Sequence, residues 1–184
     1  KKWQKLQGYV YGEGINEAVL FPGVYRFLWR CKERKIDVEI VSHKTEFGHF
    51  DDNKISLRDS ATNFLINHGL LDNKNPLIKK ITYKNSNKEK IDYIKQNNYE
   101  CFIDDLEEII FSEELEAQKG ILFSRDNLSV NNSNNIIAQS WEEISQSVLG
   151  NWNLDEVKNM ANLISNNTKV ESIEKLKGRG NSTI

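Results

Sequence analysis

The sequence has 184 residues, of which 38% are hydrophobic and 10% aromatic, so it can form one α/β core with a helical tail, whereas two complete domains would be cramped. Its formal net charge is -2 with both signs interspersed, which offers no basic stripe for nucleic acid and no polybasic anchor for anionic lipid. No apolar run approaches the roughly 20 residues that cross a bilayer, and the first residues lack the apolar core of a signal peptide. We therefore expect a cytoplasmic protein without nucleic-acid or membrane partners.

The first part of the chain, up to Gly69, predicts three helices and one strand. Residues 1–20 read as a short amphipathic helix followed by a glycine-rich loop. Apolar residues then recur at helical spacing over residues 24–31, and a β-branched run at residues 36–41 predicts a largely buried strand. Residues 57–65 predict the next helix, which ends near Gly69.

The alternation of strand and helix continues through the middle of the chain. Residues 78–83 predict a strand, and the capping-box sequence at residues 86–89 opens a helix. Further strands are expected at residues 99–103, 120–123 and 135–138, the last of them before a helix around Trp141. Strands separated by helices of this length require right-handed crossovers. We therefore expect a doubly wound α/β fold, with a mainly parallel sheet and helices on both faces.

Polar residues with a possible role in phosphate chemistry stand at the carboxyl ends of two of these strands, where ligands bind in such sheets. One strand ends at Ser42, another delivers Asp104 and Asp105, and Lys88 and Lys90 begin the helix between them. A hydroxyl can donate to a phosphoryl oxygen, an ammonium can offset its charge, and paired aspartates can hold Mg²⁺. Taken singly, these residues also fit a strand end, solvated surface charge or a helix-dipole partner. Taken together and in this order, they predict a phosphate and magnesium site.

This order of residues resembles the haloacid dehalogenase superfamily of phosphohydrolases, over roughly residues 20–125. The family's second motif, an apolar strand ending in Ser or Thr, matches VEIVSHKT at residues 38–45, and its fourth, an acidic pair after a strand, matches CFIDDL at residues 101–106. The third-motif lysine would be Lys90, because it directly precedes apolar helix positions, with Lys88 as the alternative. The acidic strand end is the more specific part of this match.

The resemblance implies a Mg²⁺-dependent phosphatase that acts on a small phosphorylated metabolite through an aspartyl-phosphate. Ser42 and Lys90 would hold the phosphoryl group, and either Asp104 or Asp105 would bind the metal. Adjacent strand residues point to opposite faces, so the sequence leaves the choice between the two aspartates open.

His43 and Lys44 follow Ser42 directly, and we expect them to form part of a substrate-facing loop. The histidines show no metal-ligand spacing. The chain also contains no Gly-x-Ser-x-Gly elbow and no Cys-x-x-Cys pair, so nothing in it favours a serine hydrolase or a zinc site.

The family's first motif is a strand ending in Asp-x-Asp, whose first aspartate attacks phosphorus, yet no aspartate occurs here before Asp37. We therefore expect residues 1–20 to be a remnant of the insert or cap between the first and second motifs, with the first strand missing. Ser42 and the Asp104-Asp105 pair should then lie at the same edge of one sheet, on strands that are adjacent or separated by the slot of the missing strand. Without the nucleophile, the chain should be inactive as a phosphatase.

The remaining segments complete the expected organisation. Residues 21–148 would form the core, and residues 149–177 a helical linker. Residues 178–184 resemble the glycine-rich turn at the start of choline-kinase and aminoglycoside-phosphotransferase-like domains, which implies a fused kinase-like domain. The alternative function is therefore a non-catalytic binding or regulatory module of a two-domain phosphotransferase protein.

Overall fold

The structure is a computed structural model, and it describes residues 2–49, 53–126 and 134–165. The chain divides into two compact units, Lys1–Val148 and Leu149–Ile184. All the described strands belong to the first unit. No helix in the described part of the chain is long and apolar enough to cross a membrane.

The first unit begins with three helical elements. They are α1 (Lys2–Tyr11), the 3-10 helix η1 (Glu13–Glu17) and α2 (Val24–Glu33). The first helix, α1, buries no residue, whereas α2 buries most of its middle, with Cys31 only 1% exposed. Gly23 begins α2 at φ +92°, a left-handed conformation that favours glycine. A Cβ at this position would lie 3.0 Å from the Trp141 Cβ, so close packing also favours glycine.

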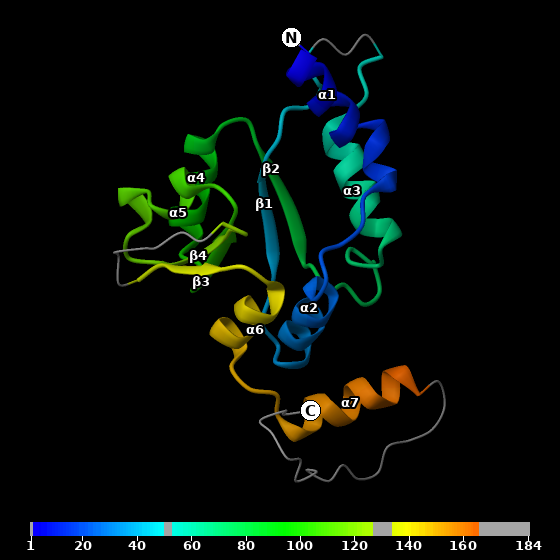
Figure 1. The fold of residues 1–184 in the computed structure, drawn as a ribbon, viewed down its shortest axis with the longest axis vertical. Coiled ribbons are helices and arrows are strands. Elements are labelled where there is room, and N and C mark those ends of the chain that lie inside the picture. Colours follow the sequence, from blue (N-terminus) through cyan, green and yellow to red (C-terminus); the bar gives the residue numbers. More distant parts are fainter. Residues whose placement is uncertain (1, 50–52, 127–133, 166–184) are drawn as a thin grey trace. The chain divides into compact units, whose positions relative to one another are not determined.

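Two parallel strands form the first sheet, β1 (Glu39–His43) and β2 (Lys80–Lys84), with Ser42 opposite Tyr83. Helices α3 (Leu57–Asn67) and α4 (Asn87–Asn97) cover its two faces (Figure 1). The hydroxyl of Tyr83 lies 2.8 Å from that of Thr62 on α3, whereas Thr82 bonds toward Tyr93 on α4. Because neighbouring strand residues point to opposite faces, the two helices lie on opposite sides of this sheet.

The second sheet has three parallel strands in the order β3-β4-β5. They are β3 (Cys101–Asp104), β4 (Lys119–Phe123) and β5 (Ile136–Ala138). Short helices α5 (Glu107–Ile110) and η2 (Glu113–Leu115) connect β3 to β4, and α6 (Trp141–Leu149) follows β5. An apolar cluster packs between this sheet and its helices, and its buried members are Ile94, Phe102, Ile109, Ile110, Leu115 and Leu122. These residues come from α4, α5, η2, β3 and β4, and none of them comes from β1 or β2.

The expected α/β class, the five strands and their parallel pairing are confirmed. The expected doubly wound sheet is not confirmed, because the described strands form two sheets and β1 does not pair with β3. Ser42 and Asp104 consequently lie on different sheets, although each stands at or next to the carboxyl end of its strand. Among the described strands, β1 bonds through its backbone only to β2, and β3 only to β4. Polar side chains, among them Glu39 and Tyr99, join the two sheets instead.

The second unit contains one described helix, α7 (Leu154–Ile164). The Asn153 side chain accepts a hydrogen bond from the Glu156 N–H at 2.8 Å, and the Glu156 carboxylate accepts one from the Asn153 N–H at 2.9 Å. This reciprocal pair is a capping box, which fixes the start of the helix. The expected phosphotransferase-like turn at residues 178–184 lies outside the described residues.

Candidate functional site

The centre of the candidate site is an ion pair between Lys90 and Asp104. Lys90 lies in the first turn of α4, where its N–H donates to the carbonyl of Ser86, the residue that caps the helix. Its ammonium donates to Oδ2 of Asp104 at the end of β3, and the two side chains are only 11% and 5% exposed. The other oxygen, Oδ1, accepts from the Leu106 N–H at 3.1 Å. Two residues chosen from the sequence are thus brought together, fourteen positions apart.

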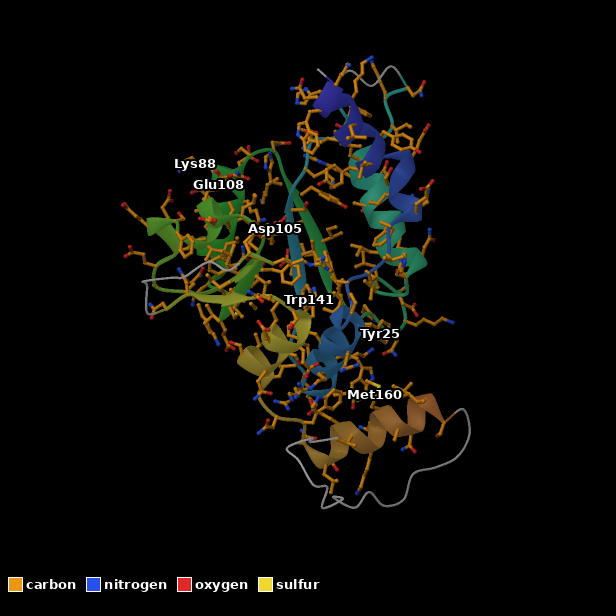
Figure 2. All side chains as sticks on the ribbon, viewed as in Figure 1. Tyr25, Lys88, Asp105, Glu108, Trp141 and Met160 are labelled. Carbon is orange, nitrogen blue, oxygen red and sulfur yellow. The ribbon has the colours of Figure 1, made fainter. Side chains whose placement is uncertain are left out.

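Asp105 differs from its neighbour in its surroundings. It is exposed, and the structure gives its carboxylate no hydrogen bond or ion pair, whereas both oxygens of Asp104 are engaged. In the view of Figure 2, Asp105 lies between helices α4 and α5 on one side and strand β1 on the other. Of the two aspartates, Asp105 therefore has the carboxylate available for a metal.

The donor set fits Mg²⁺ only in part. Magnesium is commonly held by one or two carboxylates together with water and phosphate oxygens, so the single open carboxylate of Asp105 suits that arrangement. Within the described ranges, no group of three or more His, Cys, Asp or Glu side chains is placed to hold a metal ion. These protein groups could therefore hold Mg²⁺ only together with ligand oxygens.

Lys88 and Lys90 have different surroundings in the structure. The ammonium of Lys88 is directed to Asp92 and Glu114, 3.6 Å from each, and its side chain is 73% exposed. Figure 2 shows Lys88 near Glu108, away from the centre of the fold. Only Lys90 reaches the acidic end of β3.

Two neighbouring residues of the site escaped the sequence analysis. The Asn87 amide at the start of α4 donates to the Glu108 carboxylate on α5, and this bond joins the two helices beside the ion pair. The side-chain oxygen Oδ1 of Asn87 is buried and accepts no hydrogen bond from the described residues. The available signal was the position of Asn87 directly after the helix cap, which fixes its place next to Lys90 on the first turn.

The remaining candidates lie on the other sheet. Ser42 is half-buried and lies opposite Tyr83, so both side chains are on the same face of the first sheet. His43 is exposed on the other face. Lys44 directly follows β1, and its N–H donates to the Lys84 carbonyl at 3.1 Å. No hydrogen bond or ion pair in the described chain joins Ser42, His43 or Lys44 to the Lys90 pair.

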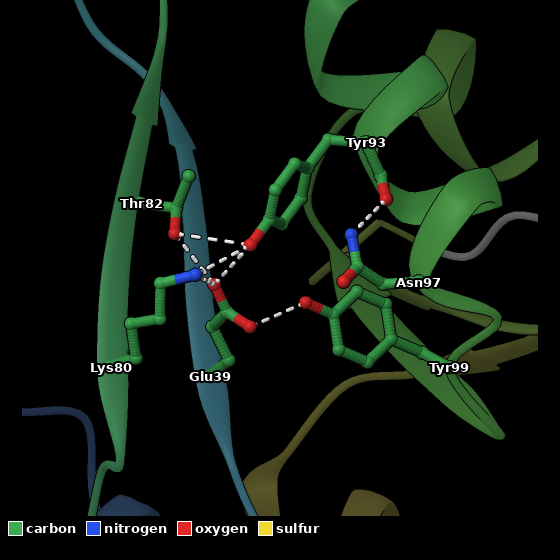
Figure 3. A network of polar contacts seen from close by, with 6 residues as sticks. All are labelled: Glu39, Lys80, Thr82, Tyr93, Asn97 and Tyr99. Atoms are coloured by element: carbon green, nitrogen blue, oxygen red, sulfur yellow. Dashed lines mark hydrogen bonds and ion pairs between the residues drawn. The ribbon is translucent and has the colours of Figure 1, made fainter.

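A polar network links the two sheets at the amino ends of β1 and β3 (Figure 3). The Glu39 carboxylate accepts hydrogen bonds from Thr82 at 2.6 Å, Tyr93 at 3.0 Å and Tyr99 at 2.5 Å. Lys80 also lies 3.4 Å from this carboxylate and donates to the Tyr93 hydroxyl at 2.8 Å. We call these five residues the Glu39 network. Sequence analysis missed it, although a glutamate within a β-branched run was a visible anomaly.

The Glu39 network shifts the ionisation of its members. Burial opposes the ionisation of Glu39, but the hydrogen bonds from Thr82, Tyr99 and Tyr93 outweigh burial and hold the Glu39 pKa below its ordinary value. Burial, together with the bond to Glu39, raises the pKa of Tyr99. Glu39 therefore stays ionised and Tyr99 neutral near pH 7, which keeps the junction of the two sheets intact.

Comparisons with protein-family models, with curated proteins and with solved structures find no match to this chain. The resemblance to the haloacid dehalogenase superfamily therefore rests on the residues of the chain alone.

Proposed function

We propose that this chain forms the phosphate- and metal-binding part of a Mg²⁺-dependent phosphohydrolase of the haloacid dehalogenase type, acting on a small phosphorylated metabolite. The observation that supports this most is the buried Lys90–Asp104 pair beside the open carboxylate of Asp105. Lys90, fourteen positions before Asp104, contacts it at the carboxyl end of a parallel strand, and Asp105 follows directly. Ligands bind at this end of the strands in sheets of this class.

Each residue has a separate role in this proposal. Asp104 holds the Lys90 ammonium in place through one oxygen, and its other oxygen fixes the turn after β3. An ammonium has three donors, so Lys90 can offer hydrogens to a phosphoryl group while keeping its bond to Asp104. Asp105 would bind Mg²⁺, which when bound offsets negative charge on the phosphoryl oxygens. Ser42 lies opposite Tyr83 on the α3 face of the first sheet, so we assign it no contact with this phosphoryl group.

The nucleophile of this proposal is an aspartate that the 184 residues do not supply. We place it on an apolar strand ending in Asp-x-Asp, between β1 and β3. Among the described strands, β1 pairs only with β2, and β3 only with β4, so each has a second backbone edge on which a further strand could pair. The chain alone should accordingly hydrolyse no aryl phosphate above background with Mg²⁺ in excess. Robust hydrolysis would mean that another residue of the chain attacks phosphorus.

The metal-binding role can be tested by calorimetric titration of Mg²⁺ in the presence of inorganic phosphate. Asp105→Asn should weaken Mg²⁺ binding about tenfold or more, because the amide lacks the charge of the ligand that it replaces. The matched control is Glu107→Gln, which removes an exposed carboxylate two residues away in the first turn of α5. Equal Mg²⁺ affinity in both variants would contradict the proposal and favour a non-catalytic binding module.

A further inference from the structure

Two cationic residues, Lys44 and Arg58, are in contact at the carboxyl ends of β1 and β2 through the backbone of Lys44. The Arg58 guanidinium, on the first turn of α3, donates through Nε to the Lys44 carbonyl at 2.9 Å. Through Nη2 it donates to the Asn85 side chain at 2.7 Å. Both Lys44 and Arg58 are half-buried. Their positions are thus fixed by the backbone at the end of the sheet, on the face that also carries Ser42.

Within residues 2–49, 53–126 and 134–165, neither cation has a carboxylate partner. The Lys44 ammonium lies 4.3 Å from the centre of the Tyr11 ring, and the contacts of Arg58 are two neutral oxygens and the Tyr83 ring at 5.6 Å. The nearby Glu89 carboxylate is occupied by the N–H of Asn85 at 3.0 Å.

Two lysines at the amino end of β2 do have carboxylate partners. Lys80 lies 3.4 Å from Glu39, and Lys79 lies 2.5 Å from Asp37. The cations at the opposite end of the sheet are therefore distinguished by the absence of a counter-ion among their contacts.

A cation that is removed from water without a counter-ion destabilises the folded chain. Burial accordingly lowers the pKa of Lys44. A contact with an aromatic ring recovers only part of that cost, on the order of 0.5–2 kcal/mol. Departures of this kind from stable design are typical of places where a ligand supplies the missing partner.

We propose that Lys44 and Arg58 form a binding site for an anionic group, and that this group is a second phosphate of the substrate, distinct from the phosphoryl group held by Lys90. The identity of the anion as part of the substrate rests on the proposed function. Asn85 connects the two sites, because it accepts from Arg58 and directly precedes the cap of α4. Lys90 follows one helical turn later, which is a rise of about 5.4 Å. The expected substrate class is therefore a small metabolite that carries two phosphate groups, of which a sugar bisphosphate is a convenient probe.

The probes are fructose 1,6-bisphosphate and fructose 6-phosphate, which differ by one phosphate, with inorganic phosphate as the free anion. Affinities are measured by calorimetry for the wild-type chain and for Lys44→Gln and Arg58→Gln, without Mg²⁺. The wild type should prefer the bisphosphate about tenfold or more, which is the size expected for charge-assisted hydrogen bonds. Both variants should lose that preference. The control Lys74→Gln, which removes an exposed lysine from a loop, should retain it.

The melting temperature separates an anion-binding role of Lys44 from a merely structural one. Because its charge is uncompensated, Lys44→Gln should melt no lower than the wild type in the absence of anions, and inorganic phosphate should stabilise the wild type more than the variant. If Arg58→Gln does not fold, the Lys44 variant decides the question.

The inference is overturned if the wild type shows no preference for the bisphosphate, or if Lys44→Gln retains that preference. Inorganic phosphate that binds at Lys44 as tightly as the bisphosphate would identify a site for free anion and would also overturn the substrate assignment. Failure of the proposed function has a separate signature, which is Mg²⁺ binding that does not respond to Asp105→Asn.

Discussion

Replacing Lys90 by Met should destabilise the chain severely. The substitution keeps an unbranched side chain in the first turn of α4 but removes the only cation in the described part of the chain that contacts Asp104. The carboxylate of Asp104 would then stay 5% exposed with a single backbone donor, from Leu106. An aspartate that is left charged and unpaired in such a position is far less stable than one in water.

The size of the effect follows from burial. Breaking a buried ion pair by removing one partner costs about 3–5 kcal/mol. For a chain of this size, that corresponds to a fall in melting temperature of about 6–20 °C. Lys88→Met is the matched control, because Lys88 is 73% exposed and lies 3.6 Å from its two carboxylate partners. Exposed pairs of this kind contribute about 0–1 kcal/mol.

The assay is urea unfolding with linear extrapolation for the wild type, Lys90→Met, Asp104→Leu and the double variant. Removing both charges should restore most of the stability, since an apolar replacement of a buried pair is often neutral or stabilising. The resulting double-mutant cycle should therefore show a coupling energy of about 2 kcal/mol or more. A Lys90→Met variant that loses no more stability than Lys88→Met would refute the buried pair.

Three further predictions concern other parts of the first unit. Because the folded pKa of Glu39 lies below its ordinary value of 4.5, its stabilising effect is complete above that pH and is lost as the pH falls through the lower folded pKa. The stability difference between the wild type and Glu39→Gln should thus shrink in acid, and a constant difference from pH 7 to pH 3 would contradict this. Burial raises the pKa of Cys31 to about 11, so iodoacetamide at pH 8 should label this thiol only in denaturant. Rapid labelling of the native chain, read by mass spectrometry, would instead show that the thiol is accessible. Amide hydrogens of β4, which pairs on both sides, should exchange more slowly than those of β1, and equal protection would mean that β1 has a second partner.

Local patterns in the sequence predict most of the strands and helices, because β-branched runs and helical spacing are properties of short segments. The boundaries shift where a local conformation intervenes. The first strand was expected at residues 36–41 but begins at Glu39, since Lys35 turns the chain at φ +59° and Ile36 is 42% exposed. Lys90 was identifiable for a similar reason: it lies four residues before Ile94, and both are buried on one face of α4.

The division into two sheets could not be predicted in this way. It depends on which strands lie side by side, and nothing in the spacing of apolar residues within a strand specifies its neighbour. The bond between Glu39 and Tyr99 spans sixty positions, and the one between Arg58 and Asn85 spans twenty-seven. Such contacts follow from the folded arrangement, so the roles of Glu39, Arg58 and Asn87 became visible only in the structure.

The Glu39 network also has a thermodynamic consequence. Its contacts are directional bonds to oxygen and nitrogen, and the apolar cluster around α4 and β3 includes no buried residue from β1 or β2. Breaking these bonds would by itself expose mainly polar groups. The sensitivity of an opening reaction to urea scales with the surface that it exposes, and its heat-capacity change depends mainly on apolar surface. Loss of these polar bonds would therefore respond weakly to urea, and its free energy would curve little with temperature. Loss of the Glu39 network would thus be visible in the ionisation of its residues before it is visible in unfolding curves.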